Sequence, residues 1–121
     1  MESTNLVPPP IVNDARYKET FILALEFIKS NADHHITCED VVASSGIYKK
    51  KLNMIFNQYL GKTVSECIAE YRIEYAKIEL ETCKNKTIRE ISEKLDFCNE
   101  YYFSRFFKKH TGKTPSQYRN S

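Results

Sequence analysis

The strongest constraint on the fold is a pattern of apolar and turn residues that occurs twice in the chain. The second copy runs from Thr87 to Arg119, and the first begins at Thr37. Corresponding apolar positions are Val41 and Ile91, Ile47 and Phe97, Leu52 and Phe103, and Phe56 and Phe107. The tripeptide Gly-Lys-Thr follows in both copies, at 61–63 and 112–114, although the internal turn is one residue longer in the second. Because self-similarity of this kind is the signature of duplicated units, we expect two related units in one chain.

Each copy contains two short helical patterns separated by a tight turn. The expected helices are 38–44 and 49–59 in the first copy and 88–94 and 99–110 in the second. Phe103, Phe106 and Phe107 recur at helical spacing and are expected to face the core. This layout is typical of a helix-turn-helix, whose second helix enters the major groove of DNA.

Three further helices are expected outside these pairs. The first covers about 14–31, the longest covers 64–82 between the two copies, and a short one starts at Pro115. Expected buried residues are Phe21, Ile22, Leu25 and Ile28 in the first, and Ile68, Tyr71, Ala76 and Leu80 in the longest. Arg72 is expected to face solvent or to pair with a carboxylate. No segment alternates as a strand would, so the helices account for the fold.

The sequence therefore predicts an all-α fold of about seven helices, with two homeodomain-like helix-turn-helix subdomains joined by a long linker helix. The expected organisation is a flexible lead-in or linker at 1–13, a first subdomain at 14–62, a linker helix at 63–82 and a second subdomain at 83–121. The lead-in contains three consecutive prolines, which favour extended backbone. It could follow a missing N-terminal sensor or dimerisation domain.

The composition favours a helical protein without catalytic or metal chemistry. Of the 121 residues, 41% are hydrophobic, which suits a globular core, and the net charge is only +2. The four cysteines occur singly, so reduced thiols and a cytoplasmic location are expected. The first residues do not show the basic-then-apolar pattern of a signal peptide, and the sequence contains no apolar run long enough to span a membrane. We expect no cofactor, no metal site and no enzymatic activity, because no nucleophile–base or carboxylate pair stands out.

The buried side of each second helix determines which residues it exposes. The exposed residues are expected to be Lys49, Lys50, Asn53, Met54 and Asn57 in the first copy, and Glu100, Tyr101, Ser104, Arg105 and Lys108 in the second. Arg105 can contact guanine O6 and N7 together, and Asn53 can make a similar paired contact with adenine. The lysines at 49–51, 108, 109 and 113 would attract phosphates. These residue types predict binding to double-stranded DNA.

The most specific residues form a longer pattern at the end of the chain. They are Ile91, Phe97, Phe103, Ser104, Arg105, Phe107, Lys108, Gly112, Thr114, Pro115, Tyr118 and Arg119, with Arg72 and Ala76 upstream. Over about 15–119 the chain resembles the DNA-binding domain of the AraC/XylS family of bacterial transcription regulators. The resemblance implies promoter binding, contact with RNA polymerase and a role such as transcription activation, with the direction of regulation open.

The resemblance also narrows the expected base contacts. It assigns them to Lys50, Asn53, Met54, Glu100, Tyr101 and Arg105, and leaves Lys49, Lys51, Ser104, Lys108, Lys109 and Lys113 as phosphate contacts. The chain departs from the family pattern at Val42, Tyr48, Met54, Ser92 and Asp96, of which Asp96 replaces a turn glycine. These departures and the low net charge leave an alternative open. In it, the chain is a helical protein-interaction module with weakened or lost DNA specificity.

Overall fold

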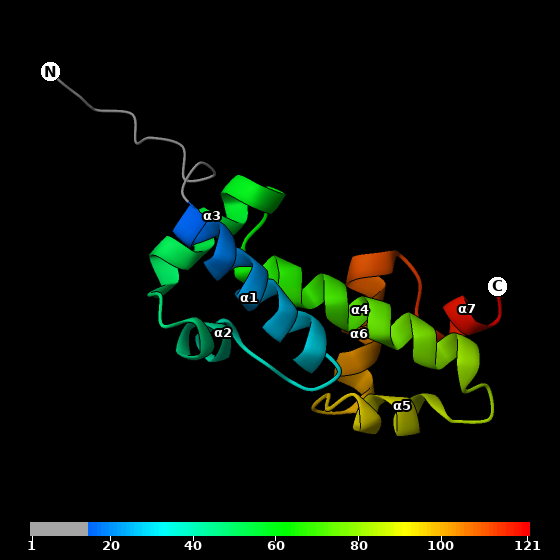
Figure 1. The fold of residues 1–121 in the computed structure, drawn as a ribbon. Coiled ribbons are helices and arrows are strands. Elements are labelled where there is room, and N and C mark those ends of the chain that lie inside the picture. The colour runs from blue at the N-terminus through cyan, green and yellow to red at the C-terminus, as the bar shows by residue number, and fades with distance from the viewer. Residues whose placement is uncertain (1–14) are drawn as a thin grey trace, which may run out of the picture.

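Seven α-helices and no strands make up residues 15–121, the part of the chain that the computed structural model describes (Figure 1). They are α1 (Ala15–Asn31), α2 (Cys38–Ser45), α3 (Lys49–Leu60), α4 (Val64–Thr82), α5 (Ile88–Lys94), α6 (Glu100–Thr111) and α7 (Pro115–Arg119). The all-α prediction is confirmed, and the predicted bounds differ from these by at most one residue. The predicted lead-in at 1–13 and the helix start at residue 14 lie outside the described residues.

Threonine caps explain why four of the helices begin where they do. Each of these threonine side chains accepts a hydrogen bond from the backbone N–H three residues on, and the side chain of that third residue in return accepts one from the threonine N–H. The capping residues are Thr37, Thr63, Thr87 and Thr114. For α2 the returning residue is Asp40, whose carboxylate accepts from the Thr37 N–H at 2.9 Å. Glutamate or glutamine is usual at this position, yet aspartate completes the cap here.

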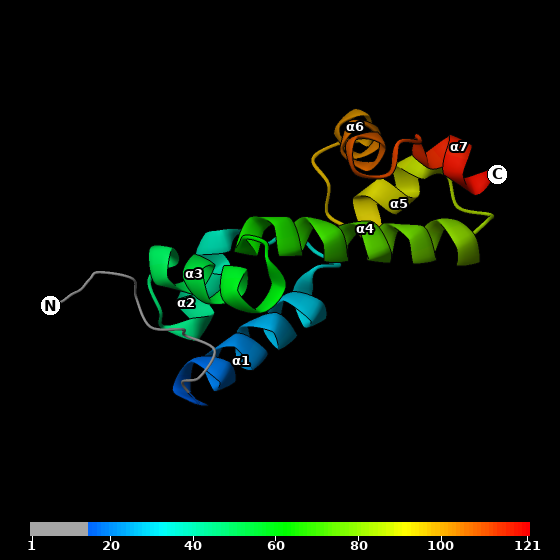
Figure 2. The same cartoon turned by 90° about the horizontal axis from the view of Figure 1, so that it is seen from above.

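Two hydrophobic clusters share α4, which passes from one to the other. The first joins α1, α2 and α3 to the start of α4 and includes Ile28, Leu52 and Phe56. The second joins α5 and α6 to the rest of α4 and includes Phe103 and Phe107. Figure 2 shows the first three helices around one end of α4 and α5, α6 and α7 beside the other. The linker helix is therefore a structural member of both helix-turn-helix units.

The last turn of the chain is held against α4 by two residues of the C-terminal pattern. Tyr118 Oη donates to the Glu81 carboxylate, and this bond raises the pKa of Tyr118 to about 12. Arg119 donates to the carbonyl oxygens of Lys86 at 2.6 Å and Cys83 at 3.0 Å. Both residues therefore act in the fold, and they place α7 beside the end of α4.

Two of the burial predictions are wrong. Ile22 is 43% exposed, because Phe21, Ala24 and Ile28 define the buried stripe of α1 and Ile22 lies about 100° around the helix from Phe21. Arg72 was expected to face solvent or to pair with a carboxylate, but it is only 5% exposed. Its position between Ile68 and Ala76 puts it on the buried face of α4.

The cysteines do not share one environment. Cys38 and Cys67 are buried, whereas Cys83 is partly exposed and Cys98 is exposed. Burial raises the pKa of the Cys67 thiol to about 11. None of the helices in residues 15–121 combines the length and the apolar character needed to cross a membrane.

Candidate nucleic-acid interface

The second helices of the two units, α3 and α6, each bury one side and expose the other. In α3, Leu52, Ile55 and Phe56 are fully buried, and in α6 the same holds for Phe103 and Phe107. The candidate residues on the outer faces are Lys50 and Met54 in α3, and Glu100, Tyr101 and Arg105 in α6, all exposed. The fold thus presents these five side chains to solvent on the two helices predicted to meet DNA.

The outer face of α6 is organised by its own side chains. Asn99 caps the helix, because its Oδ1 accepts from the Tyr102 N–H at 2.7 Å. One turn further, Arg105 Nη1 donates to Tyr101 Oη at 3.3 Å, and the guanidinium carbon lies 5.5 Å from the Tyr101 ring centroid. Tyr101 is 70% exposed, so this pair stands out from the helix and restricts where the guanidinium points. Because Arg105 is partly ordered in this way, it would lose less conformational entropy on binding a ligand.

The outer face of α3 contains one residue that is already committed within the protein. Asn53 is half-buried, and its Oδ1 accepts from the Val64 N–H at 2.9 Å, at the start of α4. A paired contact with adenine needs both the oxygen and the amide nitrogen of asparagine. The Val64 N–H therefore already uses one lone pair of the Asn53 oxygen, and the paired contact expected from the sequence would have to share this oxygen with it.

The phosphate candidates of the first unit already interact with neighbouring side chains. Lys49 Nζ lies 3.5 Å from the Glu39 carboxylate, and both side chains are largely exposed. Lys51 Nζ lies 4.7 Å from the centroid of the Tyr17 ring. Exposed ion pairs contribute little to stability, so Lys49 can exchange Glu39 for a phosphate at low cost.

The phosphate candidates of the second unit lie near the end of α6. Lys108 and Lys109 are exposed in its last turn, where positive charge also stabilises the helix dipole. Ser104 is half-buried, and Lys113 Nζ donates to Ser121 Oγ at 3.2 Å. Lys108 and Lys109 therefore stabilise α6 whether or not DNA is bound. Arg105 lies in the middle of α6, where positive charge does not stabilise the helix dipole.

Positive charge is concentrated on α3 and α6. The three lysines of α3 stand without any acidic residue, a net charge of +3. Arg105, Lys108 and Lys109 of α6 stand against Glu100 alone, a net charge of +2. These two helices therefore hold +5, while the whole chain has +2, which leaves −3 on the remainder. The low total hides a strong segregation of charge towards the two helices that the repeat singled out.

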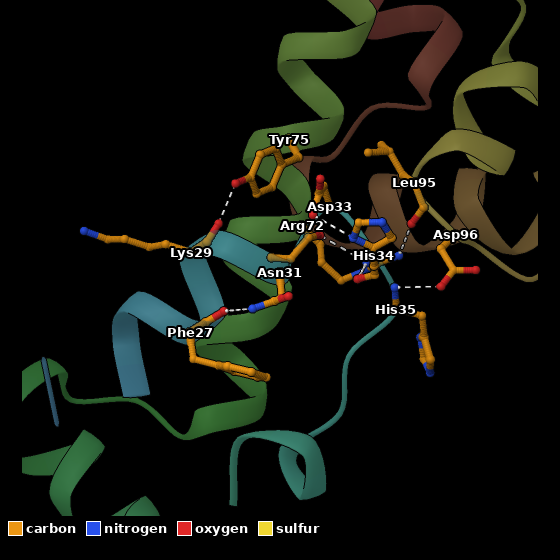
Figure 3. Close-up of polar contacts among 11 residues, drawn as sticks. Phe27, Lys29, Asn31, Asp33, His34, His35, Arg72, Tyr75, Leu95 and Asp96 are labelled. Atoms are coloured by element: carbon orange, nitrogen blue, oxygen red, sulfur yellow. Dashed lines mark hydrogen bonds and ion pairs between the residues drawn. The ribbon is translucent and has the colours of Figure 1, made fainter. Parts of the chain in front are cut away.

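The two units also contact each other directly, and this contact was not among the expectations drawn from the sequence. Arg72 of α4 donates to the carbonyl oxygens of Ala32 at 3.1 Å, His34, and Leu95 at 2.8 Å (Figure 3). The first two acceptors belong to the segment after α1, and the third ends α5. Burial lowers the pKa of the Arg72 guanidinium, and the nearby Asp96 carboxylate opposes this shift.

Asp96 makes the second link between the units. Its Oδ2 accepts from the His35 N–H at 3.0 Å (Figure 3). An open cleft of about 610 Å³ adjoins the residues that link the two units. Its lining includes Lys49 from α3 and Tyr102 and Phe106 from α6. The residues that link the units thus adjoin a cleft lined by both second helices.

The i, i+4 spacing of Ile68, Arg72, Ala76 and Leu80 was a sequence signal that Arg72 faces inward.

Comparison with known proteins agrees with this architecture. A family model described as a helix-turn-helix domain matches residues 41–121. The chain belongs to the AraC-type helix-turn-helix family. It is 32% identical over 112 residues to the arabinose operon regulatory protein of Salmonella typhimurium, covering 92% of this chain and 37% of that protein. It is 33% identical over 110 residues to the TetD protein of transposon Tn10 from Escherichia coli, covering 90% of this chain and 79% of that protein.

A solved AraC-type structure has the same arrangement of helices. The C-terminal domain of AraT, a response regulator from Geobacillus stearothermophilus, matches with a TM-score of 0.78 and 27% identity, and 87% of each chain is covered. The present chain spans 37% to 57% of the length of three of its curated relatives. The similarity therefore concerns their helix-turn-helix region, to which the resemblance seen in the sequence also pointed.

Proposed function

We propose that this protein binds double-stranded DNA in a sequence-specific way and thereby regulates transcription. The observation that carries the proposal is the concentration of positive charge on α3 and α6, the second helices of two helix-turn-helix units. A helix of this kind fits the major groove, where Arg105 can donate twice to guanine. Membership of the AraC-type family supports the same conclusion. Contact with promoter-bound RNA polymerase belongs to the proposal, as does cooperation with a sensor or dimerisation domain.

Both helices would be used on one duplex. They belong to units on different parts of α4, and helices that enter adjacent major-groove segments must lie about 34 Å apart unless the DNA bends. We propose base contacts from Lys50, Met54, Tyr101, Arg105, Glu100 and the amide nitrogen of Asn53. The target is therefore expected to consist of two short sequence blocks separated by about one helical turn.

Selection from a randomised duplex pool at near-physiological salt tests the proposal. Two enriched blocks about one helical turn apart are the expected result. A single enriched block would restrict sequence recognition to one unit. The absence of any enrichment, with only weak retention of DNA, would contradict the proposal and favour the alternative of a protein-interaction module.

Replacing Arg105 by alanine should weaken binding mainly at one base position of the selected site. The expected loss is about 1–3 kcal/mol of discrimination there, because one paired contact with guanine disappears. The melting temperature should not change, since Arg105 is exposed and its hydrogen bond within the described residues is to Tyr101 on its own helix. Binding to sites altered one base pair at a time measures the effect.

Lys108→Ala is the matched control on the same helix. A phosphate contact carries no sequence information, so this variant should bind all sites more weakly by a similar factor. If Arg105→Ala also lowered the affinity for all sites equally, Arg105 would be a phosphate contact and its assignment to a base would be wrong.

The affinity for DNA should fall steeply as salt is raised. With several lysines and Arg105 displacing counterions, we expect the logarithm of the association constant to fall with the logarithm of salt concentration with a slope of about −3 to −5. Titrations of one labelled duplex at four salt concentrations would measure this slope. A flat response would show that the charges on α3 and α6 do not meet phosphates.

A further inference from the structure

The turn before α6 contains a residue whose backbone conformation is unfavourable for its type. Asp96 has φ 62°, and it is the only residue other than glycine with positive φ in the part of the chain that the structure describes. The corresponding turn of the first unit has Gly46, at φ 73°. Glycine adopts this left-handed region freely, whereas a residue with a side chain is strained there. An aspartate at this position therefore calls for a compensating interaction.

The compensating interaction reaches into the other unit. Asp96 Oδ2 accepts from the backbone N–H of His35, 61 residues away in sequence and located between α1 and α2 (Figure 3). A glycine could not make this bond. The acceptor is a carboxylate, and hydrogen bonds to ionised acceptors are stronger than those between neutral groups.

Arg72 ties the same two segments together from the side of α4. Its guanidinium donates to Ala32 and His34 in the first segment and to Leu95 in the second, and lies 4.2 Å from the centroid of the Phe97 ring. Residues 32–35 and 95–97 are therefore joined directly by the bond from the His35 N–H to Asp96, and indirectly through Arg72, which donates to both segments. We call these two segments, with Arg72, the inter-unit junction.

The inter-unit junction lies immediately before α2 of the first unit and α6 of the second. Thr37, two residues after His35, caps α2, and Asn99, three residues after Asp96, caps α6. A shift of one segment against the other would move these caps and the helices that follow them. Outside the junction, the connection between the units runs through the packing of both on α4.

We propose that Asp96 is a positioning residue that fixes the two helix-turn-helix units relative to each other and thereby restricts the spacing of DNA blocks that the protein accepts. The proposal rests on the proposed function for its DNA consequence. Asp96 itself need not touch DNA. Its role is to make one relative placement of α3 and α6 lower in free energy than other placements. A correctly spaced site is then bound without rearranging the two units.

The test compares Asp96→Gly with Asp96→Asn in the full chain. Glycine accepts positive φ and removes the bond to His35, so the variant should fold at least as well as the original protein. Asparagine removes the same charge but keeps an oxygen that can accept from the His35 N–H, and it also tolerates the left-handed region. The difference between the two variants therefore isolates the hydrogen bond from the change in charge.

The first readout is affinity for duplexes whose two selected blocks are separated by the preferred distance or by one base pair more or less. We expect Asp96→Gly to reduce the preference for the correct spacing by roughly threefold to tenfold, the effect of losing one hydrogen bond. Asp96→Asn should keep most of the preference. An unchanged spacing profile in Asp96→Gly, or an equal loss in Asp96→Asn, would overturn the proposal.

The second readout needs no DNA. Residual dipolar couplings of the free protein report the relative orientation of the two units, and we expect Asp96→Asn to keep the couplings of the original chain and Asp96→Gly to change them. Failure of the original chain to select any DNA would refute the proposed function alone, since the couplings still test the junction. Identical couplings in all three proteins would show that Asp96 does not hold the units together.

Discussion

Replacing Phe107 by alanine is expected to unfold the second helix-turn-helix, lowering the free energy of unfolding by about 3–5 kcal/mol. Phe107 is fully buried, and its ring centroid lies 6.1 Å from that of Phe103 and 5.4 Å from that of Tyr118. The substitution would leave a cavity where α6 and α7 pack together, and the lost contacts cannot be recovered without moving both helices. Urea unfolding followed by circular dichroism measures the change.

Phe106→Ala is the matched control, on the same helix and with the same change in side chain. Phe106 is only half-buried, next to Phe97 and His110, so its removal should cost clearly less than that of Phe107. Equal losses in the two variants would mean that the buried face of α6 has been assigned to the wrong residues.

Replacing Arg72 by methionine should lower the free energy of unfolding by about 2–4 kcal/mol. Methionine can fill the space of the aliphatic part, but the carbonyl oxygens of Ala32 and Leu95, both bonded in buried surroundings, would lose their donor. Each buried polar group without a partner costs about 1–3 kcal/mol. Part of this loss is offset, because the variant no longer has to bury the charge of Arg72. Thermal and urea unfolding of the purified protein would measure the loss.

Lys77→Met is the matched control, because it replaces a positively charged residue of the same helix by the same side chain. Lys77 also lies on α4, and it pairs with Glu74 at 3.6 Å in a partly exposed position. Its replacement should change stability by less than about 0.5 kcal/mol. A loss of that small size for Arg72→Met would show that water or backbone rearrangement satisfies the abandoned carbonyl groups, contrary to the role assigned to Arg72.

The parts of the fold that could be predicted depend on local signals. Threonine caps and the glycines at 46, 61 and 112 mark helix ends through bonds that span a few residues, so the bounds were predictable to within one residue. The buried faces of α3 and α6 follow from helical spacing of large apolar residues, and the exposure of Lys50, Met54, Tyr101 and Arg105 follows from those faces. Whether these side chains contact bases stays a prediction.

The parts that could not be predicted depend on partners far apart in sequence. The Val64 N–H donates to Asn53 and the His35 N–H donates to Asp96, and both bonds arise only when separate segments of the chain come together. Arg72 was misassigned because a charged residue was expected to avoid the core, although its spacing placed it on the buried stripe. A buried arginine that donates to three carbonyl groups satisfies both constraints, since these hydrogen bonds offset part of the cost of burying its charge.

The segregation of charge also bears on how the protein first meets DNA. Five glutamates on α4 oppose Arg72 and Lys77, so this helix alone has a net charge of −3, while α3 and α6 are basic. Charge is therefore distributed unevenly along the chain in spite of its small total. Under the proposed function, the basic helices α3 and α6 attract the phosphates of a duplex whereas the acidic helix α4 repels them, so encounters that bring α3 and α6 towards the DNA are favoured before contact.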